Sequence, residues 1–334
     1  MLHSQFHVKF RFLILSLFMI GSSQTVLSQE LEGCPIFPAN NVWNTRIDHL
    51  PVDPRSSDYV NSIGSDIGLH PDFGSGLWRG APNGIPYTIV SDPIEFVSVS
   101  FDYSDESDMG PYPIPPDAAI EGGPDSTGDR HIIIVDKNTC MLYELFAAYQ
   151  NPDGSWRAGS GAIFDLRSNS LRPEGWTSAD AAGLPILPGL ARFEEAASGE
   201  IRHALRFTCE QTRQAYVWPA RHYASRSSDP TLPPMGQRFR LKSSFDTSGF
   251  SSQSKVILNA LKEYGMILAD NGGNWFISGC PDSGWDNDRL VNELRTVKGS
   301  DFEAVDISSL IKNPDSAEIY PFTANTAVEN PKTY

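Results

Sequence analysis

Apolar and polar positions alternate along much of this chain, which predicts β-strands. Residues 96–101 follow a strict period of two, and 85–90 form another strand candidate. Three longer apolar runs follow, separated by short turns: 131–135, 141–149 and 156–166. The turns contain Asn, Asp, Pro and Gly, which favour chain reversal. We predict a three-stranded antiparallel meander here.

Further strands are predicted in the second half of the chain. Residues 204–208 and 215–218 are expected to pair as neighbouring strands, and 238–242 alternates basic and apolar side chains. Residues 266–270 and 274–278 flank an Asn-Gly-Gly sequence, which is a strong hairpin signal. Strands therefore recur at the spacing of a sandwich or barrel.

Helical periodicity is confined to a few segments. Apolar residues between 256 and 264 recur at helical spacing, Ser251 and Ser252 precede them, and Gly265 follows. A second helix is predicted from Asp286 to Leu294, and a short one at 58–63. The fold class expected is mostly β, an antiparallel β-sandwich or jelly-roll-like domain with a few peripheral helices.

The chain begins with the pattern of a secretory signal peptide. Lys9 and Arg11 precede an apolar run at 12–20, which is shorter than the ~20 residues of a membrane span. We predict cleavage after Ser28 and a secreted or periplasmic protein without a membrane span in the mature chain; a membrane anchor is the alternative. The remaining units expected are an extended segment at 29–83 packed on the body, a β-rich main domain at 84–312, and a tail at 313–334.

Charge and cysteine content narrow the partners and the compartment. The net charge is −15, and removal of residues 1–28 takes away two more basic side chains, so nucleic acid is not an expected partner. The cysteines are Cys34, Cys140, Cys209 and Cys280. Their wide spacing excludes a compact metal knuckle and allows up to two disulfides in three pairings, or buried free thiols.

A long acidic loop is expected at 102–128. It is rich in Asp, Glu and Pro, and oxygen ligands of this kind bind calcium, although a solvated loop is the alternative. The sequence leaves any other cofactor open.

The first candidate catalytic set lies on the predicted 204–208 and 215–218 strand pair. It comprises His203, Arg206, Tyr216 and His222. Gathered on one sheet, these groups suit β-elimination of a uronic polysaccharide, in which Arg neutralises the carboxylate and His or Tyr transfers protons. Ordinary polar sheet residues are the alternative.

The second candidate set is formed by carboxylates that interrupt apolar strands: Glu144, Asp165 and Asp270. Charged groups are rarely buried unless they are paired, so each lies either in a functional cleft or in a structural ion pair. Two of them flanking a sugar would serve as the acid and the base or nucleophile of a glycoside hydrolase.

Aromatic and basic residues nearby are candidates for substrate binding: Trp176, Trp218, Arg221 and Tyr223. Indole and phenol rings stack on the apolar faces of sugars. A metal site is the weaker hypothesis, since His70-Pro71-Asp72 and Asp129-Arg130-His131 bring His and Asp together without a recognised ligand spacing. We therefore assign no metal ligand.

Four segments together resemble a group of secreted bacterial proteins over residues 34–306: 159–166, 175–180, 201–207 and 216–222. This resemblance implies no activity and brings no catalytic residues. The chain is also loosely similar to jelly-roll alginate and glucuronan lyases, because 201–203 and 216–218 echo their His and Tyr motifs, but the glutamine and lysine of those motifs are absent.

The function expected is action on an extracellular polysaccharide as a lyase or glycoside hydrolase. The alternatives are a non-catalytic carbohydrate-binding or cell-envelope protein and a metal-dependent hydrolase.

Overall fold

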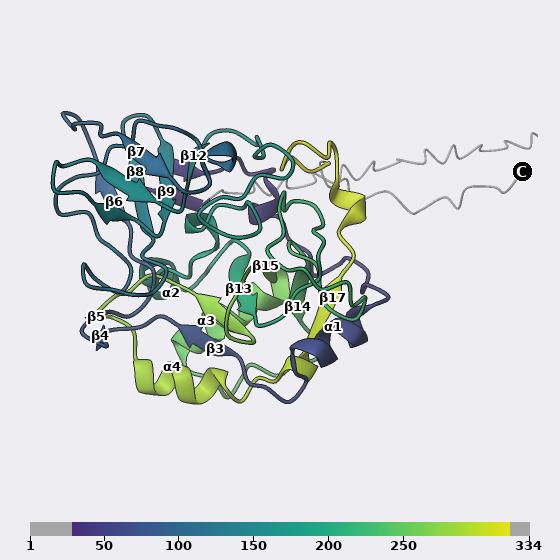
Figure 1. The fold of residues 1–334 in the computed structure, drawn as a ribbon. Helices are drawn as coiled ribbons and strands as arrows, with labels where there is room; N and C mark the ends of the chain where they lie inside the picture. The colour runs from purple at the N-terminus through teal and green to yellow at the C-terminus, as the bar shows by residue number, and fades with distance from the viewer. Residues whose placement is uncertain (1–28, 321–334) are drawn as a thin grey trace, which may run out of the picture.

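The computed structural model describes residues 29–320 (Figure 1). Strands predominate over helices and are arranged in several sheets, so the predicted mostly β class is confirmed. The sheets contain both parallel and antiparallel pairs, which differs from the purely antiparallel arrangement expected. The predicted signal peptide and residues 321–334 of the predicted tail lie outside the described residues.

A four-stranded sheet with the order β12-β9-β8-β6 contains the predicted meander. Its strands are β6 (Thr88–Val90), β8 (Ile132–Asp136), β9 (Met141–Phe146) and β12 (Ser160–Asp165). β8, β9 and β12 pair antiparallel as predicted, and β6 joins parallel to β8. Every residue of β8 is buried because both faces of this sheet are covered.

A small sheet has the strand order β10-β11-β7. Two of its strands, β10 and β11, lie between β9 and β12 in the sequence. Its strands are β7 (Val99–Phe101), β10 (Tyr149–Gln150) and β11 (Trp156–Ala158). The predicted strand at 156–166 is thus divided between two sheets. The division falls at Gly159, where the backbone passes so close to the Phe146 ring that a Cβ atom would lie 2.6 Å from it.

The largest sheet has six strands in the order β17-β14-β15-β13-β16-β3. They are β3 (His70–Asp72), β13 (Leu205–Cys209), β14 (Arg238–Leu241), β15 (Met266–Asn271), β16 (Phe276–Ser278) and β17 (Phe302–Val305). β13 is central, parallel to β15 and antiparallel to β16. The strand predicted at 238–242 is confirmed as β14.

Two predicted hairpins in this region were wrong. β15 and β16 flank the Asn-Gly-Gly turn but do not pair, because β13 lies between them. Trp275 follows the turn and is fully buried, with its ring stacked on those of Phe207 (5.8 Å) and Phe302 (5.3 Å). This packing places the chain after the turn on the far edge of β13, where β16 forms. The 215–218 segment does not pair with β13 either; Tyr216 instead forms an isolated bridge with Met235.

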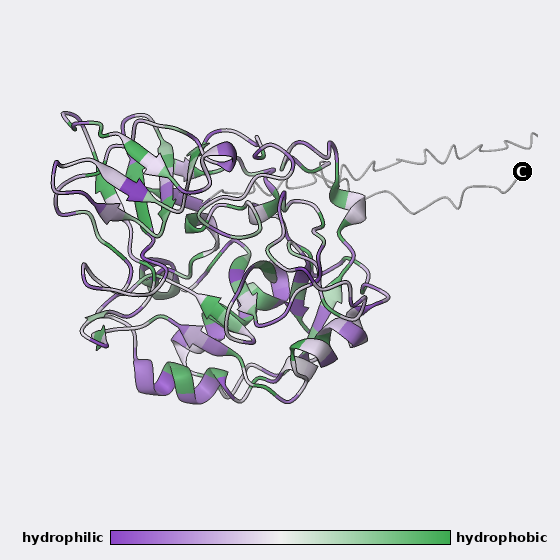
Figure 2. Ribbon diagram, in the orientation of Figure 1, coloured by the Kyte–Doolittle hydropathy of each residue, from purple (hydrophilic) through white to green (hydrophobic). Residues whose placement is uncertain are grey.

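The predicted helices are confirmed as α1 (Ser56–Ile63), α3 (Ser252–Glu263) and α4 (Asn287–Leu294); α2 (Phe193–Ser198) is additional. α3 contacts β14, α2 and α4, and α1 packs on β17. Figure 2 shows green apolar and purple polar positions alternating along α4, as expected for an amphipathic surface helix. No helix within residues 29–320 is long and apolar enough to cross a membrane.

The remaining elements are short. The other strands form two hairpins, β1 (Gln29–Leu31) with β2 (Cys34–Ile36) and β4 (Leu77–Trp78) with β5 (Ala81–Pro82). The 3-10 helices are η1 (Val42–Asn44), η2 (Ser104–Glu106), η3 (Leu187–Gly189), η4 (Gly299–Asp301) and η5 (Ser308–Leu310).

One main hydrophobic core joins the four-stranded and six-stranded sheets. Ile133 of β8 belongs to the same buried cluster as Phe207 of β13 and Ile267 of β15, whereas Ile132 and Ile134 of β8 belong to a second cluster. This alternation follows from the two-residue period of a strand. The β8 face that carries Ile133 is therefore directed toward the larger sheet.

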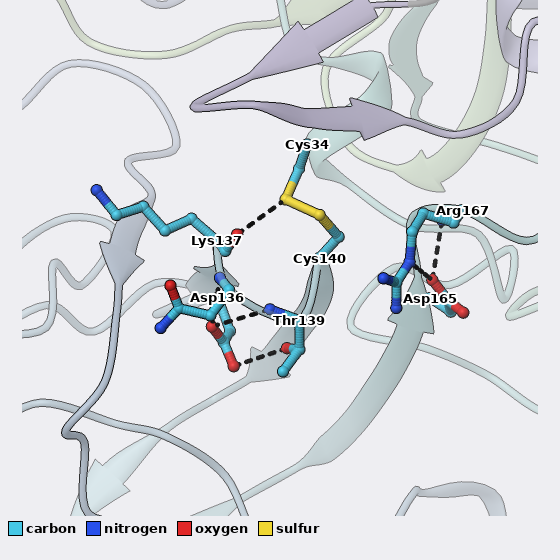
Figure 3. Close-up of a disulfide and its surroundings, with 8 residues drawn as sticks. Cys34, Asp136, Lys137, Thr139, Cys140, Asp165 and Arg167 are labelled. Atoms are coloured by element: carbon cyan, nitrogen blue, oxygen red, sulfur yellow. Dashed lines mark hydrogen bonds and ion pairs between the residues drawn. A yellow bond between two sulfur atoms is a disulfide. The ribbon is translucent and has the colours of Figure 1, made fainter.

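A disulfide between Cys34 of β2 and Cys140 anchors the N-terminal segment to the β8–β9 turn (Figure 3). Cys209 and Cys280 are free and buried. The bond agrees with an extracytoplasmic location, where disulfides form and persist.

Removal of the disulfide is expected to lower the free energy of unfolding by about 2–4 kcal/mol, because it closes a loop spanning 106 residues in the unfolded chain. The variant is Cys34→Ala with Cys140→Ala, measured by urea unfolding with and without reductant. Reductant should destabilise the wild type and leave the variant unchanged. Equal unfolding midpoints for the oxidised wild type and the variant would contradict the prediction.

Candidate functional site

A group of charged and polar side chains gathers where the loop before β8 and the segment before α2 meet the six-stranded sheet. We call this group the polar cluster. Its members are Asp72, Glu121, Asp129, His131, Asp180, Arg206, Asp270 and Ser278. It contains five carboxylates, and ion pairs or hydrogen bonds link most of its members.

Arg206 of β13 is the centre of the polar cluster. Its guanidinium donates two hydrogen bonds to the buried carboxylate of Asp180, both 2.7 Å, and one to the Ser278 hydroxyl at 2.6 Å. The Asp270 carboxylate lies 3.5 Å from the same guanidinium. Burial opposes the charge on Arg206, but Asp180 outweighs it and raises the pKa, so the buried pair stays ionic.

Asp270 lies near the end of β15, and its side chain is 23% exposed. Burial raises the pKa of Asp270 to about 7; the negative charge of Asp180 adds to the rise, and Arg206 opposes it. A carboxyl group with this pKa carries a proton at neutral pH for part of the time while still reaching solvent. Asp270 is therefore chemically suited to act as a general acid.

Asp72 comes from β3 at the sheet edge. The strand register places Asp72 beside Ser278 of β16, and Ser278 in turn contacts Arg206 of β13. Asp72, Ser278 and Arg206 thus follow one another across β3, β16 and β13, whereas Asp270 of β15 is level with Thr208, two residues beyond Arg206. The Asp72 side chain reaches solvent, and its partial shielding raises its pKa.

His131 and Glu121 form a second ion pair within the polar cluster. His131 is buried just before β8, and its Nδ1 atom lies 2.6 Å from the Glu121 carboxylate. Burial lowers the pKa of His131, but Glu121 outweighs this effect and raises it to about 9. The Nε2 atom lies 3.1 Å from the carbonyl oxygen of Ala179, next to Asp180.

The four residues predicted to form a lyase site are not brought together as predicted. His203 is fully buried, with its Nε2 atom 3.1 Å from Glu195 and its Nδ1 atom 2.8 Å from the Ala204 carbonyl. Since 215–218 does not pair with β13, the register that was expected to align His203 with His222 does not exist. Of the four, only Arg206 belongs to the polar cluster.

Tyr216 and His222 instead form an aromatic surface with Tyr223. The Tyr223 ring is stacked near both, with ring centroids 6.3 Å from Tyr216 and 5.8 Å from His222. The Tyr216 hydroxyl donates to Glu174 at 2.8 Å, and His222 lies 3.7 Å from Glu106. This surface adjoins the polar cluster, because Ala182 donates its N–H to Ala269, next to Asp270, and accepts from Arg221, next to His222.

The other predicted substrate-binding residues have mixed environments. Trp176 is half-buried, with the Arg172 guanidinium 5.5 Å from its ring centre. Trp218 donates its indole N–H to Ser316, and buried Arg221 binds Pro314 and Asp315. Trp218 and Arg221 therefore anchor the 313–320 segment, which gives both a structural role.

Asp165 is a surface residue whose carboxylate pairs with Arg167 at 3.2 Å, with both side chains about half exposed (Figure 3). It belongs to no cluster of catalytic groups among the described residues. This agrees with the structural alternative for Asp165.

Glu144 is fully buried on β9 and accepts hydrogen bonds from the backbone N–H groups of Ile186 and Leu187, at 2.9–3.0 Å. Burial raises the pKa of Glu144 to about 7, and the hydrogen bonds only partly offset it. Glu144 holds the segment before α2 against the four-stranded sheet and does not reach solvent.

The raised pKa of Glu144 predicts a pH dependence of stability. Because the folded protein holds this proton more tightly than the unfolded chain, the stabilisation is complete below about pH 4.5 and is lost as the pH rises through about 7. Glu144→Gln keeps an acceptor oxygen for both amides and removes the titration. Urea unfolding between pH 4.5 and about 8 should show a flatter pH dependence for this variant, with Asp165→Asn as the control. Parallel curves for Glu144→Gln and the wild type would contradict this.

Most members of the polar cluster were not selected as site residues from the sequence. Asp72 belongs to the His70-Pro71-Asp72 sequence, Asp129 and His131 belong to the Asp129-Arg130-His131 sequence, and Glu121 belongs to the acidic loop at 102–128. Asp180 lies in the 175–180 segment and Ser278 at the end of the predicted 274–278 strand, and neither was selected as a site residue. Of the acidic residues of the 102–128 loop, Glu121 alone takes part in a group of three converging metal-ligand side chains within residues 29–320.

Comparison with protein-family models, curated proteins and solved structures gave no match, so the polar cluster is interpreted from its own geometry.

Proposed function

We propose that this protein is an extracytoplasmic glycoside hydrolase that acts on a polysaccharide, with Asp270 as the general acid. The observation that carries the proposal is the partly exposed Asp270 carboxyl group, whose pKa is raised to about 7 beside the buried Arg206–Asp180 pair. Such a group donates a proton to a leaving glycosidic oxygen near neutral pH.

Asp72 supplies the second carboxylate. Three strand steps separate β15 from β3, or about 14 Å between backbones at ~4.8 Å for each step. In this arrangement one carboxylate protonates the leaving oxygen and the other activates a water molecule or attacks the sugar. The separation of the two carboxyl groups decides between inversion and retention, and the anomeric configuration of the first product reports which of the two occurs.

The aromatic surface of Tyr216, His222 and Tyr223 supports a sugar substrate. It adjoins Asp270 through the backbone contacts of Ala182, and Tyr223 is 36% exposed. Rings in such a position stack on the apolar faces of pyranoses. The exposed Trp78 of the β4–β5 hairpin offers a further platform six residues after Asp72 in the chain.

A hydrolase fits these contacts better than the predicted lyase. Arg206 is already bound to Asp180 through two hydrogen bonds, so it does not offer a free guanidinium to a uronate carboxylate. His203 is buried and has no path to a sugar proton. The jelly-roll arrangement on which the lyase likeness depends stays a prediction.

An extracytoplasmic location is supported by two independent features. The first is the predicted signal peptide at 1–28, and the second is the Cys34–Cys140 disulfide. The resemblance to secreted bacterial proteins points the same way and stays a prediction.

The test is a screen of purified mature protein against neutral and uronic polysaccharides, with reducing ends and unsaturated uronates measured in parallel. New reducing ends without uronate absorbance are expected, and NMR of the first product reports inversion or retention at the anomeric carbon. Absorbance of unsaturated uronates would replace the hydrolase with a lyase. Measurable glycan binding without cleavage across the panel would favour the non-catalytic carbohydrate-binding alternative, which the aromatic surface also accommodates.

A further inference from the structure

A histidine and two carboxylates converge at one side of the polar cluster. The ligand atoms of Glu121, Asp129 and His131 all lie within 4.8 Å of one another. Ligands about 2.1 Å from a common ion in a tetrahedral site lie about 3.4 Å apart, so side-chain shifts on the order of 1 Å bring all three into coordination distance. The group is reached from solvent, because Asp129 is exposed and a quarter of the Glu121 side chain is accessible.

The histidine is oriented as metal-binding histidines are. The Nε2 atom of His131 lies 3.1 Å from the Ala179 carbonyl, an acceptor that requires a hydrogen on Nε2. The Nδ1 atom is then the one directed at the carboxylates, 2.6 Å from Glu121. Metal-ligating imidazoles are held in this way by a carbonyl or carboxylate on the other ring nitrogen.

The backbone that carries two of the three ligands is held rigidly by Arg130. This residue is buried, and its guanidinium donates to the carbonyl oxygens of Pro124 (2.7 Å), Ser126 (3.0 Å) and Ala148 (2.9 Å). It also lies over the Tyr149 ring at 4.3 Å. Asp129 and His131 flank Arg130, so their positions are set before any ion binds, which favours binding.

The local charge balance favours a cation. Asp72 lies close enough for the charges of Glu121 and Asp129 to act on it, so three carboxylates face this region. His131 balances one of these carboxylates, Glu121, and the Arg206 guanidinium is already paired with Asp180 and shared with Asp270. A divalent ion that displaces the proton from His131 Nδ1 would offset the remaining negative charge.

We propose that Glu121, Asp129 and His131 bind one divalent transition-metal ion. The imidazole ligand favours Zn²⁺ over Ca²⁺, which prefers oxygen ligands alone, and the two carboxylates also suit Mn²⁺. Three protein ligands leave coordination positions open toward Asp72 and solvent, as catalytic metal sites do. This site goes beyond the hydrolase proposal, because ion binding is measured without substrate and each proposal can fail alone.

The experiment uses mature protein stripped with a chelator and titrated with Zn²⁺ and with Mn²⁺ by calorimetry. One equivalent of ion is expected to bind. Affinity should fall at least tenfold in Asp129→Asn and in Glu121→Gln. Asp125→Asn is the matched control, because Asp125 is an exposed carboxylate of the same loop outside the ligand group, and its affinity should be unchanged. Thermal unfolding without metal checks that each variant is folded.

Pulsed electron paramagnetic resonance of the Mn²⁺-loaded protein provides a second readout. Coupling to one imidazole nitrogen is expected, since His131 is the only histidine in the ligand group found among the described residues. No binding of either ion at millimolar concentration would overturn the proposal. Equal affinity in the wild type and Asp129→Asn, or bound Mn²⁺ without nitrogen coupling, would overturn it as well.

Discussion

Asp270→Asn is expected to lower the rate of polysaccharide hydrolysis by about 10²–10⁴-fold, because an amide cannot donate the proton that the leaving oxygen needs. The substitution keeps the shape of the side chain and the acceptor oxygen for the backbone N–H of Asn271, 2.7 Å away. The folded structure should therefore be retained. The measurement is kcat on the polysaccharide that gives the highest activity in the screen.

The control for Asp270→Asn is Asp165→Asn, which changes an exposed carboxylate paired only with Arg167. Its activity should equal that of the wild type. The pH profile adds a second check: wild-type activity should decline as the pH rises above about 7, when the general acid loses its proton. Activity of Asp270→Asn within threefold of the wild type would show that another group donates the proton.

Arg206→Met is expected to lower the free energy of unfolding by about 3–5 kcal/mol, the usual cost of leaving one member of a buried ion pair unpaired. Asp180 is fully buried and receives two hydrogen bonds from Arg206, and Ser278 and Asp270 also lose their contact. Urea unfolding at neutral pH measures the loss.

Two comparisons separate the unpaired charge from lost packing. The double variant Arg206→Met with Asp180→Asn removes both charges and should recover at least half of the stability lost in Arg206→Met. Arg167→Met breaks the exposed pair with Asp165 and should cost less than about 1 kcal/mol. A loss of less than about 1 kcal/mol for Arg206→Met would show that the stability of the buried Asp180 carboxylate does not require the Arg206 guanidinium.

The elements predicted correctly are those whose signal is local. β8 and β9 are apolar runs of strand length joined by a short turn, β12 is a third such run, and α3 and α4 carry helical periodicity. A short turn favours pairing of the strands that it joins, and a helix closes its hydrogen bonds within its own segment. These features needed no knowledge of distant residues.

The errors lie where strand partners are distant in the sequence. The Asn-Gly-Gly turn indicated a β15–β16 hairpin, yet β13, more than fifty residues earlier, is inserted between the two strands. The insertion gives the fully buried β13 a hydrogen-bonded neighbour on each edge, β15 and β16. Buried Trp275 also stacks on Phe207 of β13. Burial of apolar area outweighed a local turn preference.

The candidate site follows the same division. Asp270 was selected because a charge in an apolar strand demands a partner or a function, and Arg206 was selected as a member of the lyase set; both belong to the polar cluster. Their partners Asp180 and Ser278 were not selected, because nothing in the sequence indicated that either residue would meet Arg206. His203 was selected as a catalytic base, but the chain buries it against Glu195.

The sequence by itself determined the acidic charge, the β-rich class and the local elements, because these depend on composition and on spacing between near neighbours. The export signal is predicted from the same kind of local pattern. Only the tertiary structure decided the Cys34–Cys140 pairing, the order of the six strands and the polar cluster. Each of these joins residues far apart in the chain, and their meeting depends on how the whole core packs. The charge pairs follow from that packing, since buried carboxylates and guanidinium groups are stable only where the fold brings them together.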